Sequence, residues 1–338
     1  MNAPAAARTV YLSPELENSP PMDWLCTQFV LSLVARQGNS FNWRRDINNL
    51  MGLAGRHLVW PEHVLVRMRA FLSKRCHDNA FWQGHEGLSH HEFLQQYGYW
   101  RGAYEEGSLF YYMDEFVKES PKEVRTMLSA TAEWLQQSLQ KTPIRMQQNI
   151  DALGQLLQLN PAERALLLYG SLSRYQRELR SLLVEFKVNS ASDAHAALAE
   201  VTGAQASDIA EALGVGSRLE RIGIMENLIS EHVVTDLADL MKVSDRLPPM
   251  LMREYRNEQE LMAVFTKLAA PSALSASDFS YVGQDVQALT QLLKSARQSK
   301  QNGINVLLYG PPGTGKTELA KVVVQAAGLD CFEVEFAV

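Results

Sequence analysis

Eight consecutive residues near the C-terminal end of the chain have the types and the spacing that phosphate binding requires. They match the pattern G-x-x-x-x-G-K-[ST] and are Gly310, Pro311, Pro312, Gly313, Thr314, Gly315, Lys316 and Thr317. Glycines let such a loop bend with its backbone N–H groups pointing inward, and the helix that follows directs its positive end at the phosphates. We expect the Lys316 ammonium to contact the β and γ phosphates and the Thr317 hydroxyl to be a ligand of Mg²⁺.

The segments on either side of this loop have the patterns of strands and a helix. The apolar run from Ile304 to Tyr309 predicts a short buried strand of a parallel sheet. A helix is expected over 317–327, where Gly328 ends it, and residues 331–336 predict a second strand. Strand, loop, helix and strand make a βαβ unit, and this is the context that a chance match to the motif would lack.

Two stretches of the sequence resemble the opening of an AAA+ ATPase domain. The first covers residues 306–321, and the two prolines inside its loop are typical of that family. The second covers residues 278–284, Asp-Phe-Ser-Tyr-Val-Gly-Gln, and is similar to the segment that begins the family's domain. The resemblance implies that Val282 and Gly283 contact the adenine and that Glu318, after the motif, belongs to the nucleotide site.

The resemblance covers residues 278–338 and implies a P-loop α/β domain that binds and hydrolyses ATP with Mg²⁺, with Lys316 as the catalytic residue. Proteins of this family usually form homo-oligomeric rings and use ATP turnover to remodel a macromolecule. We therefore expect ATP as the ligand, a ring as the assembly, and a protein substrate or adaptor as the partner of the region before the domain.

The later parts of such a domain are not found in the sequence. They are a Walker B strand that ends in Asp-Glu, a polar sensor residue and an arginine from a neighbouring subunit. Asp330, Glu333 and Glu335 lie around the second expected strand and do not replace the Walker B pair. We expect the chain to be the front part of a longer protein, truncated shortly after the motif and not competent in hydrolysis alone. The strand at 304–309 would then lack both of its neighbours.

The composition narrows the possible classes of function. The chain of 338 residues is 46% hydrophobic and has a net charge of −6, which excludes general disorder and a strongly basic binder of nucleic acid or membranes. Its three cysteines, Cys26, Cys76 and Cys331, are too scattered for a disulfide framework and indicate a reducing, cytoplasmic location. The sequence has no secretory signal and no apolar run of about 20 residues, so no membrane association is expected.

The spacing of apolar residues divides the chain into regions. We expect a mainly α N-terminal region, which includes a winged-helix-like segment, followed by the start of a P-loop α/β domain. The expected parts are a disordered tail (1–20), an aromatic-rich helical subdomain (21–142), a second helical subdomain (143–270) with the winged-helix-like segment at 204–235, a linker (271–277) and the incomplete AAA+ domain (278–338). In the second subdomain, helices are expected at 144–158, 161–172, 174–187, 192–201, 206–213, 217–223 and 257–269.

The winged-helix-like segment leaves two interpretations open. One is DNA binding, and the other is a structural or protein-binding role. Its second helix has only Arg218 and Arg221 as cations, with Glu220 between them, and residues 1–270 hold 27 Lys and Arg against 32 Asp and Glu. Because phosphate contacts dominate affinity for DNA, this charge favours the second interpretation. The alternatives to an ATPase are thus a non-catalytic interaction module with an inert P-loop and a DNA-binding ATPase.

Two further groups of residues have a structural and a functional interpretation. His85, His90, His91 and Glu92 could hold a metal, but their spacing matches no zinc pattern, and a polar loop with a helix start explains them better. The aromatic residues between 97 and 116 could bind a protein partner, but core packing is the favoured interpretation. These aromatic residues are Tyr97, Tyr99, Trp100, Tyr104, Phe110, Tyr111, Tyr112 and Phe116.

Overall fold

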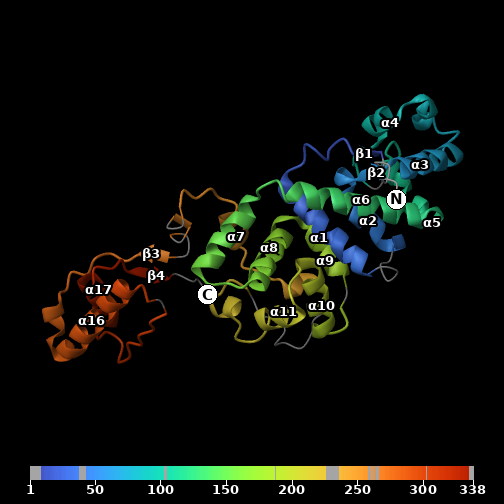
Figure 1. The fold of residues 1–338 in the computed structure, drawn as a ribbon. Helices are drawn as coiled ribbons and strands as arrows, with labels where there is room; N and C mark the ends of the chain where they lie inside the picture. Colours follow the sequence, from blue (N-terminus) through green and yellow to red (C-terminus); the bar gives the residue numbers. More distant parts are fainter. Residues whose placement is uncertain are drawn as a thin grey trace, which may run out of the picture. The chain divides into compact units, whose positions relative to one another are not determined.

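The structure is a computed structural model, shown in Figure 1. It describes residues 9–37, 43–102, 105–186, 188–225, 236–257, 260–261, 263, 266–301 and 303–334. Contacts within the chain divide it into two units, residues 1–254 and 255–338. Among the described residues no helix is long and apolar enough to cross a membrane.

The first unit is almost entirely helical, which confirms the expected class. Its longer helices are α1 (Pro21–Gln37), α2 (Trp43–Ala54), α3 (Glu62–Arg75), α4 (His90–Tyr97), α5 (Met113–Glu119), α6 (Pro121–Leu139), α7 (Arg145–Leu156), α8 (Pro161–Tyr175), α9 (Arg177–Glu185), α10 (Ala191–Thr202) and α11 (Ala206–Ala212). Shorter elements are the strands β1 (Val10–Leu12) and β2 (Val59–Pro61), the single turns α12 (Arg218–Arg221), α13 (Leu237–Leu240) and α14 (Leu247–Leu251), and the 3₁₀ turns η2 (Gly55–His57), η3 (Ala80–Trp82), η4 (His85–Gly87) and η5 (Leu109–Tyr112).

Helix α1 joins the two helical subdomains that the sequence analysis separates at 142/143. It packs on α6 and also on α9 and α10. Its Phe29 ring stacks on Tyr169 of α8, with 4.0 Å between ring centroids. Its Arg36 forms ion pairs with Asp193 at 3.5 Å and with Glu200 at 3.0 Å. The expected division into 21–142 and 143–270 is therefore wrong, because one shared core covers both parts up to residue 254.

The expectation of a disordered tail over 1–20 is wrong for residues 9–20. Strand β1 pairs antiparallel with β2, and Tyr11 lies opposite Trp60. Leu16 is fully buried, and the Trp24 indole N–H donates to the Leu16 carbonyl oxygen at 2.9 Å. The prolines of this segment end regular structure but do not prevent a three-residue strand and a buried side chain. Residues 1–8 lie outside the described part of the chain.

Aromatic residues from the cluster at 97–116 fill the core around α4 and α5. Tyr97 stacks on Trp82 with 4.4 Å between centroids, and Phe110 and Phe116 are fully buried. Core packing, the favoured interpretation, is confirmed for these residues. Tyr104 lies outside the described residues.

The histidines considered as metal ligands have other surroundings. His85 lies edge-on against Trp82, with 6.0 Å between ring centroids, and is buried. Arg69 of α3 donates to the His85 carbonyl oxygen at 2.8 Å and lies 3.0 Å from Nδ1 of His90. Among the described residues, no group of three or more histidine, cysteine, aspartate or glutamate side chains could hold a metal ion.

The helices expected from the start of the second subdomain to residue 213 are present with ends that differ by a few residues. The Asn160 side chain accepts a hydrogen bond from the Glu163 backbone, and the Glu163 carboxylate accepts one from the Asn160 backbone. This capping box starts α8 where the sequence pattern places it. In the winged-helix-like segment, α11 and α12 form, and Met225 makes an isolated bridge to Val243. Residues 226–235 of that segment lie outside the described residues.

The second unit has a different composition of elements. They are β3 (Thr266–Leu268), η7 (Ala276–Val282), α16 (Gly283–Ser299), α17 (Lys316–Ala326) and β4 (Phe332–Val334). β3 pairs antiparallel with β4, with Lys267 opposite Glu333. The expected helix at 257–269 is therefore wrong over 266–268, where the backbone donors and acceptors pair with a strand far along the chain. This strand also places residues before the expected linker in the same unit as the loop at 310–317.

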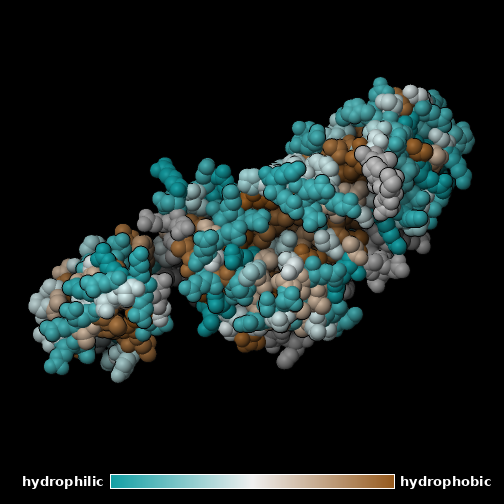
Figure 2. Space-filling view, viewed as in Figure 1, coloured by the Kyte–Doolittle hydropathy of each residue, from teal (hydrophilic) through white to brown (hydrophobic). Residues whose placement is uncertain are grey.

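The segment 304–309 is not the buried parallel strand that its apolar residues predict. It has no assigned secondary structure and no strand pairing, and Leu307 and Tyr309 are 83% and 88% exposed. A parallel strand needs neighbours on both edges and cover on both faces, and no other described strand pairs with it. The second expected strand forms only as Phe332–Val334, and Glu335 and Phe336 lie outside the described residues. Figure 2 shows some hydrophobic residues at the surface of the unit that holds α16 and α17.

Candidate functional site

The loop at 310–317 has a backbone that only glycine adopts readily. The φ angles of Gly310, Gly313 and Gly315 are +146°, +80° and +79°, in the region that side chains with a Cβ rarely enter. Gly315 is the N-cap of α17, and no side chain caps the helix there. The first backbone N–H groups of α17 are therefore available to an anion, and the helix dipole favours negative charge at this end.

Two polar side chains of the loop donate hydrogen bonds to backbone carbonyl oxygens of the same loop. The Lys316 ammonium donates to the carbonyl oxygens of Gly310 at 3.0 Å and Pro311 at 2.7 Å. The Thr314 hydroxyl donates to the Pro311 carbonyl oxygen at 3.0 Å. Thr317, in the first turn of α17, is exposed. The loop thus brings a cation, a hydroxyl and a helix N-terminus together. The ammonium and the backbone N–H groups suit phosphate oxygens, and the hydroxyl oxygen suits the Mg²⁺ that accompanies phosphate.

The turn η7 holds the loop from one side. The Phe279 ring is buried, and a Cβ added to Gly315 would lie 3.4 Å from it. Phe279 belongs to a small core with Val286 of α16 and Val322 and Val323 of α17. This core attaches the helix that begins at the loop to the helix that precedes it.

Tyr281 makes a second contact between η7 and the loop. Its hydroxyl donates to the Thr314 carbonyl oxygen at 3.3 Å, while the side chain is 69% exposed. Val282, expected at the adenine, is half-buried and packs on the core around Phe279, and Gly283 is the first residue of α16. The structure thus places Phe279 and Tyr281 of the segment 278–284 against the loop.

Glu318 belongs to a chain of polar contacts that runs from the segment before η7 to β4. The Ser272 hydroxyl donates to one of its carboxylate oxygens at 2.6 Å, and Lys321 lies 3.2 Å from the other. Lys321 also lies 3.2 Å from the Glu333 carboxylate. The hydrogen bond from Ser272 and the Lys321 charge lower the pKa of Glu318, and the bonds to Glu333 and Glu318 raise the pKa of Lys321. Glu318 therefore fixes the first turn of α17 to neighbouring segments.

Sequence reasoning missed the contributions of Ser272 and Tyr281. Both depend on how the chain folds back on the loop, since Ser272 lies 46 residues from Glu318 and Tyr281 lies 33 residues from Thr314. The signal for Tyr281 was present as an aromatic residue within the segment 278–284. Ser272 gave no signal, because small polar residues are common in linkers.

Comparison with known proteins gives one family match and several partial matches to curated proteins. Residues 306–337 match the model of the family "ATPase family associated with various cellular activities (AAA)". A probable inactive ATP-dependent zinc metalloprotease, FTSHI 4, chloroplastic, from Arabidopsis thaliana is 36% identical over 77 residues, which are 21% of this chain and 9% of that protein. The Holliday junction branch migration complex subunit RuvB of Mesomycoplasma hyopneumoniae (strain 7448) is 46% identical over 46 residues, 13% of this chain and 14% of that protein.

The matched regions are short compared with the proteins that contain them. The chain covers about a tenth of the length of these curated relatives. No solved structure matches the chain. The structure shows a mainly helical N-terminal region, and residues near the C-terminal end match the AAA family model, which agrees with the expected fold class.

Proposed function

Because residues 306–337 carry AAA-family sequence, we propose that this chain binds ATP together with Mg²⁺ through residues 310–317. The observation that carries the proposal is the backbone of the loop. Three glycines with positive φ lead directly into an α-helix whose N-terminus no side chain caps. This arrangement provides backbone N–H groups for phosphate oxygens, and a loop without glycines could not form it without strain.

Each polar group of the loop has a role toward the nucleotide. The Lys316 ammonium exchanges its two carbonyl partners for phosphate oxygens, with which charge-assisted hydrogen bonds are stronger. The exposed Thr317 hydroxyl is the residue that would hold Mg²⁺. When bound, this ion offsets negative charge on the phosphates. Val282 and Gly283 are proposed to lie at the adenine, and Glu318 to position the first turn of α17.

ATP hydrolysis, and the work that it drives, are proposed only for a protein that contains a whole AAA domain. There we propose a homo-oligomeric ring in the cytoplasm that hydrolyses ATP and remodels a macromolecule. The first unit then recognises a protein substrate or adaptor. This role of the first unit is supported by its separate core and its acidic composition, which suit contacts with protein better than contacts with nucleic acid.

A second candidate is a non-catalytic interaction module whose loop does not bind nucleotide. The observation that favours it is the exposed run 304–309, since this segment would support the loop if it lay in a sheet. DNA binding is less well supported. Arg218, one of two cations of the α12 turn, pairs with Glu163 at 3.8 Å and donates to the Gln158 carbonyl oxygen, so it already has partners within the fold.

Isothermal titration of the 338-residue chain with ATP and Mg²⁺ tests the proposal. We expect saturable binding with a dissociation constant near 10 µM, about −7 kcal/mol. Inorganic tripolyphosphate, titrated in parallel, should bind more weakly, because it lacks the base and the ribose. Absence of binding for both ligands would refute the proposal and support the interaction module.

A further inference from the structure

The side chain of Lys321 lies between two carboxylates in the second unit. Its ammonium is 3.2 Å from the carboxylate of Glu318, three residues earlier on α17, and 3.2 Å from the carboxylate of Glu333 on β4. The Lys321 side chain is only 14% exposed, whereas those of Glu318 and Glu333 are 38% and 41% exposed. Because salt screens partly buried charges less than exposed ones, the Lys321 charge acts on its neighbours more than that of a surface lysine would.

Glu318 holds a negative charge at the end of α17 where the phosphates are proposed to bind. It follows Lys316 and Thr317 directly, so these three residues lie in the first turn of the helix. A carboxylate at this end is favourable in the free protein, because it complements the helix dipole. The same charge opposes an incoming phosphate, since two anions close together repel each other. A phosphate site that includes Glu318 therefore gains affinity from a cation that offsets this carboxylate.

Lys321 is placed to offset the Glu318 charge. Between described residues, Glu318 forms an ion pair with Lys321 alone. The Ser272 hydroxyl donates to the other carboxylate oxygen at 2.6 Å, so each oxygen of the Glu318 carboxylate has a partner. The hydroxyl is neutral and can fix the direction of the carboxylate, but only the ammonium compensates its charge.

Glu333, the other partner of Lys321, has a second cation nearby. Lys267 lies opposite Glu333 in the antiparallel pair of β3 and β4. Side chains at such opposite positions start about 5 Å apart on the same face, and opposite charges there attract each other. The group thus contains the two ammoniums of Lys267 and Lys321 and the two carboxylates of Glu318 and Glu333. With Lys267 beside Glu333, the Lys321 charge can serve Glu318.

We propose that Lys321 is a positioning residue of the nucleotide site, which acts through Glu318. It holds the Glu318 carboxylate and offsets its charge, so that phosphate meets less repulsion from the first turn of α17. This role rests on the proposed binding of ATP and adds a residue outside the loop at 310–317. In a merely structural role, Lys321 would only attach α17 to β4 through Glu333.

Isothermal titration of the 338-residue chain with ATP and Mg²⁺ separates these two roles. Lys321→Met should weaken binding about fivefold, a typical charge effect at a helix end, and Lys321→Arg should retain the parent affinity. Glu333→Gln, which breaks the ion pair with β4 and keeps the one with Glu318, should bind as the parent chain does. In about 1 M NaCl the loss in Lys321→Met should shrink to less than about twofold, because salt screens charge but does not replace packing.

A double variant and a control complete the test. Glu318→Gln combined with Lys321→Met removes both charges and should restore the parent affinity to within about twofold. Lys294→Met, at an exposed position of α16, should leave binding unchanged. If the parent chain does not bind ATP, the proposed function fails and this role fails with it.

Four results with a parent chain that does bind ATP would refute the role of Lys321 alone. The first is equal affinity of Lys321→Met and the parent. The second is a loss in Glu333→Gln as large as that in Lys321→Met. The third is a double variant that binds as weakly as Lys321→Met, and the fourth is a loss in Lys321→Met that persists in high salt.

Discussion

The Lys316 ammonium lies 2.7 Å from the carbonyl oxygen of Pro311, the second residue of the same loop. The loop thus uses the cation to satisfy its own carbonyl groups before any phosphate arrives. Such a contact keeps the side chain over the concave face of the loop, where an incoming phosphate would meet it. A neutral carbonyl is a weaker partner than a phosphate oxygen, so the exchange is favourable on binding.

Replacing Lys316 by Ala should weaken binding of ATP and Mg²⁺ by about 100-fold, because a hydrogen bond to a charged group is worth roughly 1.5–3 kcal/mol. Isothermal titration measures the change, and the far-ultraviolet circular dichroism spectrum should not change. The matched control is Lys294→Ala, at an exposed position of α16, which removes the same charge away from the loop. Equal affinity of the Lys316 variant and the control would refute the role of Lys316.

Gly315→Ala should destabilise the start of α17 by roughly 1–2 kcal/mol, because φ of +79° forces a Cβ against the following carbonyl group. Hydrogen exchange followed by mass spectrometry should show faster exchange in peptides that cover 316–326. Gly283→Ala is the control, since Gly283 has φ of −58° and a Cβ there meets nothing within 4 Å. Protection of α17 in the Gly315 variant equal to that in the control would contradict the strain argument.

Sequence patterns predicted the elements whose stability is local. The α8 helix starts at Asn160-Pro161 because the cap and the first-turn proline act within one turn. The glycines of the loop at 310–317 likewise indicate the positive φ angles that the loop adopts. Segment 304–309 failed as a strand because pairing depends on residues elsewhere, which no local pattern reveals. The merging of the two helical subdomains was missed for the same reason, since the Phe29–Tyr169 stack joins residues 140 positions apart.

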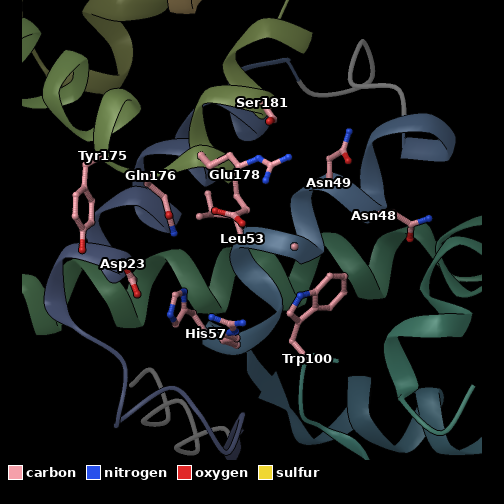
Figure 3. A pocket seen from close by; sticks show the side chains of 13 residues that line it. Asp23, Asn48, Asn49, Leu53, His57, Trp100, Tyr175, Gln176, Glu178 and Ser181 are labelled. Carbon is pink, nitrogen blue, oxygen red and sulfur yellow. The ribbon is translucent and has the colours of Figure 1, made fainter. Parts of the chain in front are cut away.

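The nucleotide site and the cavity lined by α1, α2, η2 and α9 (Figure 3) differ in how far the sequence identifies them. The loop is contiguous, so residue types and spacing identify it. The cavity draws Asp23, His57, Trp100 and Glu178 from four separate segments, and none of them is notable in the sequence alone.

Phe29→Ala should lower the free energy of unfolding of the first unit by about 3–5 kcal/mol, since it removes a buried aromatic ring between α1 and α8. Urea unfolding measures this loss.

All six tryptophans lie between residues 24 and 134, so tryptophan fluorescence reports on one half of the unit and circular dichroism on both halves. If the shared core is correct, both signals shift together. A shift in fluorescence alone would show two independent subdomains. Val66→Ala, a residue 50% exposed, should change stability by less than about 0.5 kcal/mol.

The free energy of unfolding should decrease as the pH is lowered, and His57 should account for part of this decrease. Burial, and secondarily Arg56, lowers the pKa of His57 from 6.5 to about 4. Because the unfolded chain binds this proton more readily, the stabilising contribution is complete above pH 6.5 and is lost as the pH falls toward 4. Between pH 7 and pH 5 the parent chain should lose about 2 kcal/mol more stability than His57→Asn, in which the proton-binding ring is absent. Urea unfolding at the two pH values measures the difference.

His77→Asn, which removes a histidine with a side chain 70% exposed, should retain the full pH dependence of the parent chain. The assignment fails if the His57 variant and the parent lose equal stability, because the proton uptake would then belong to another group.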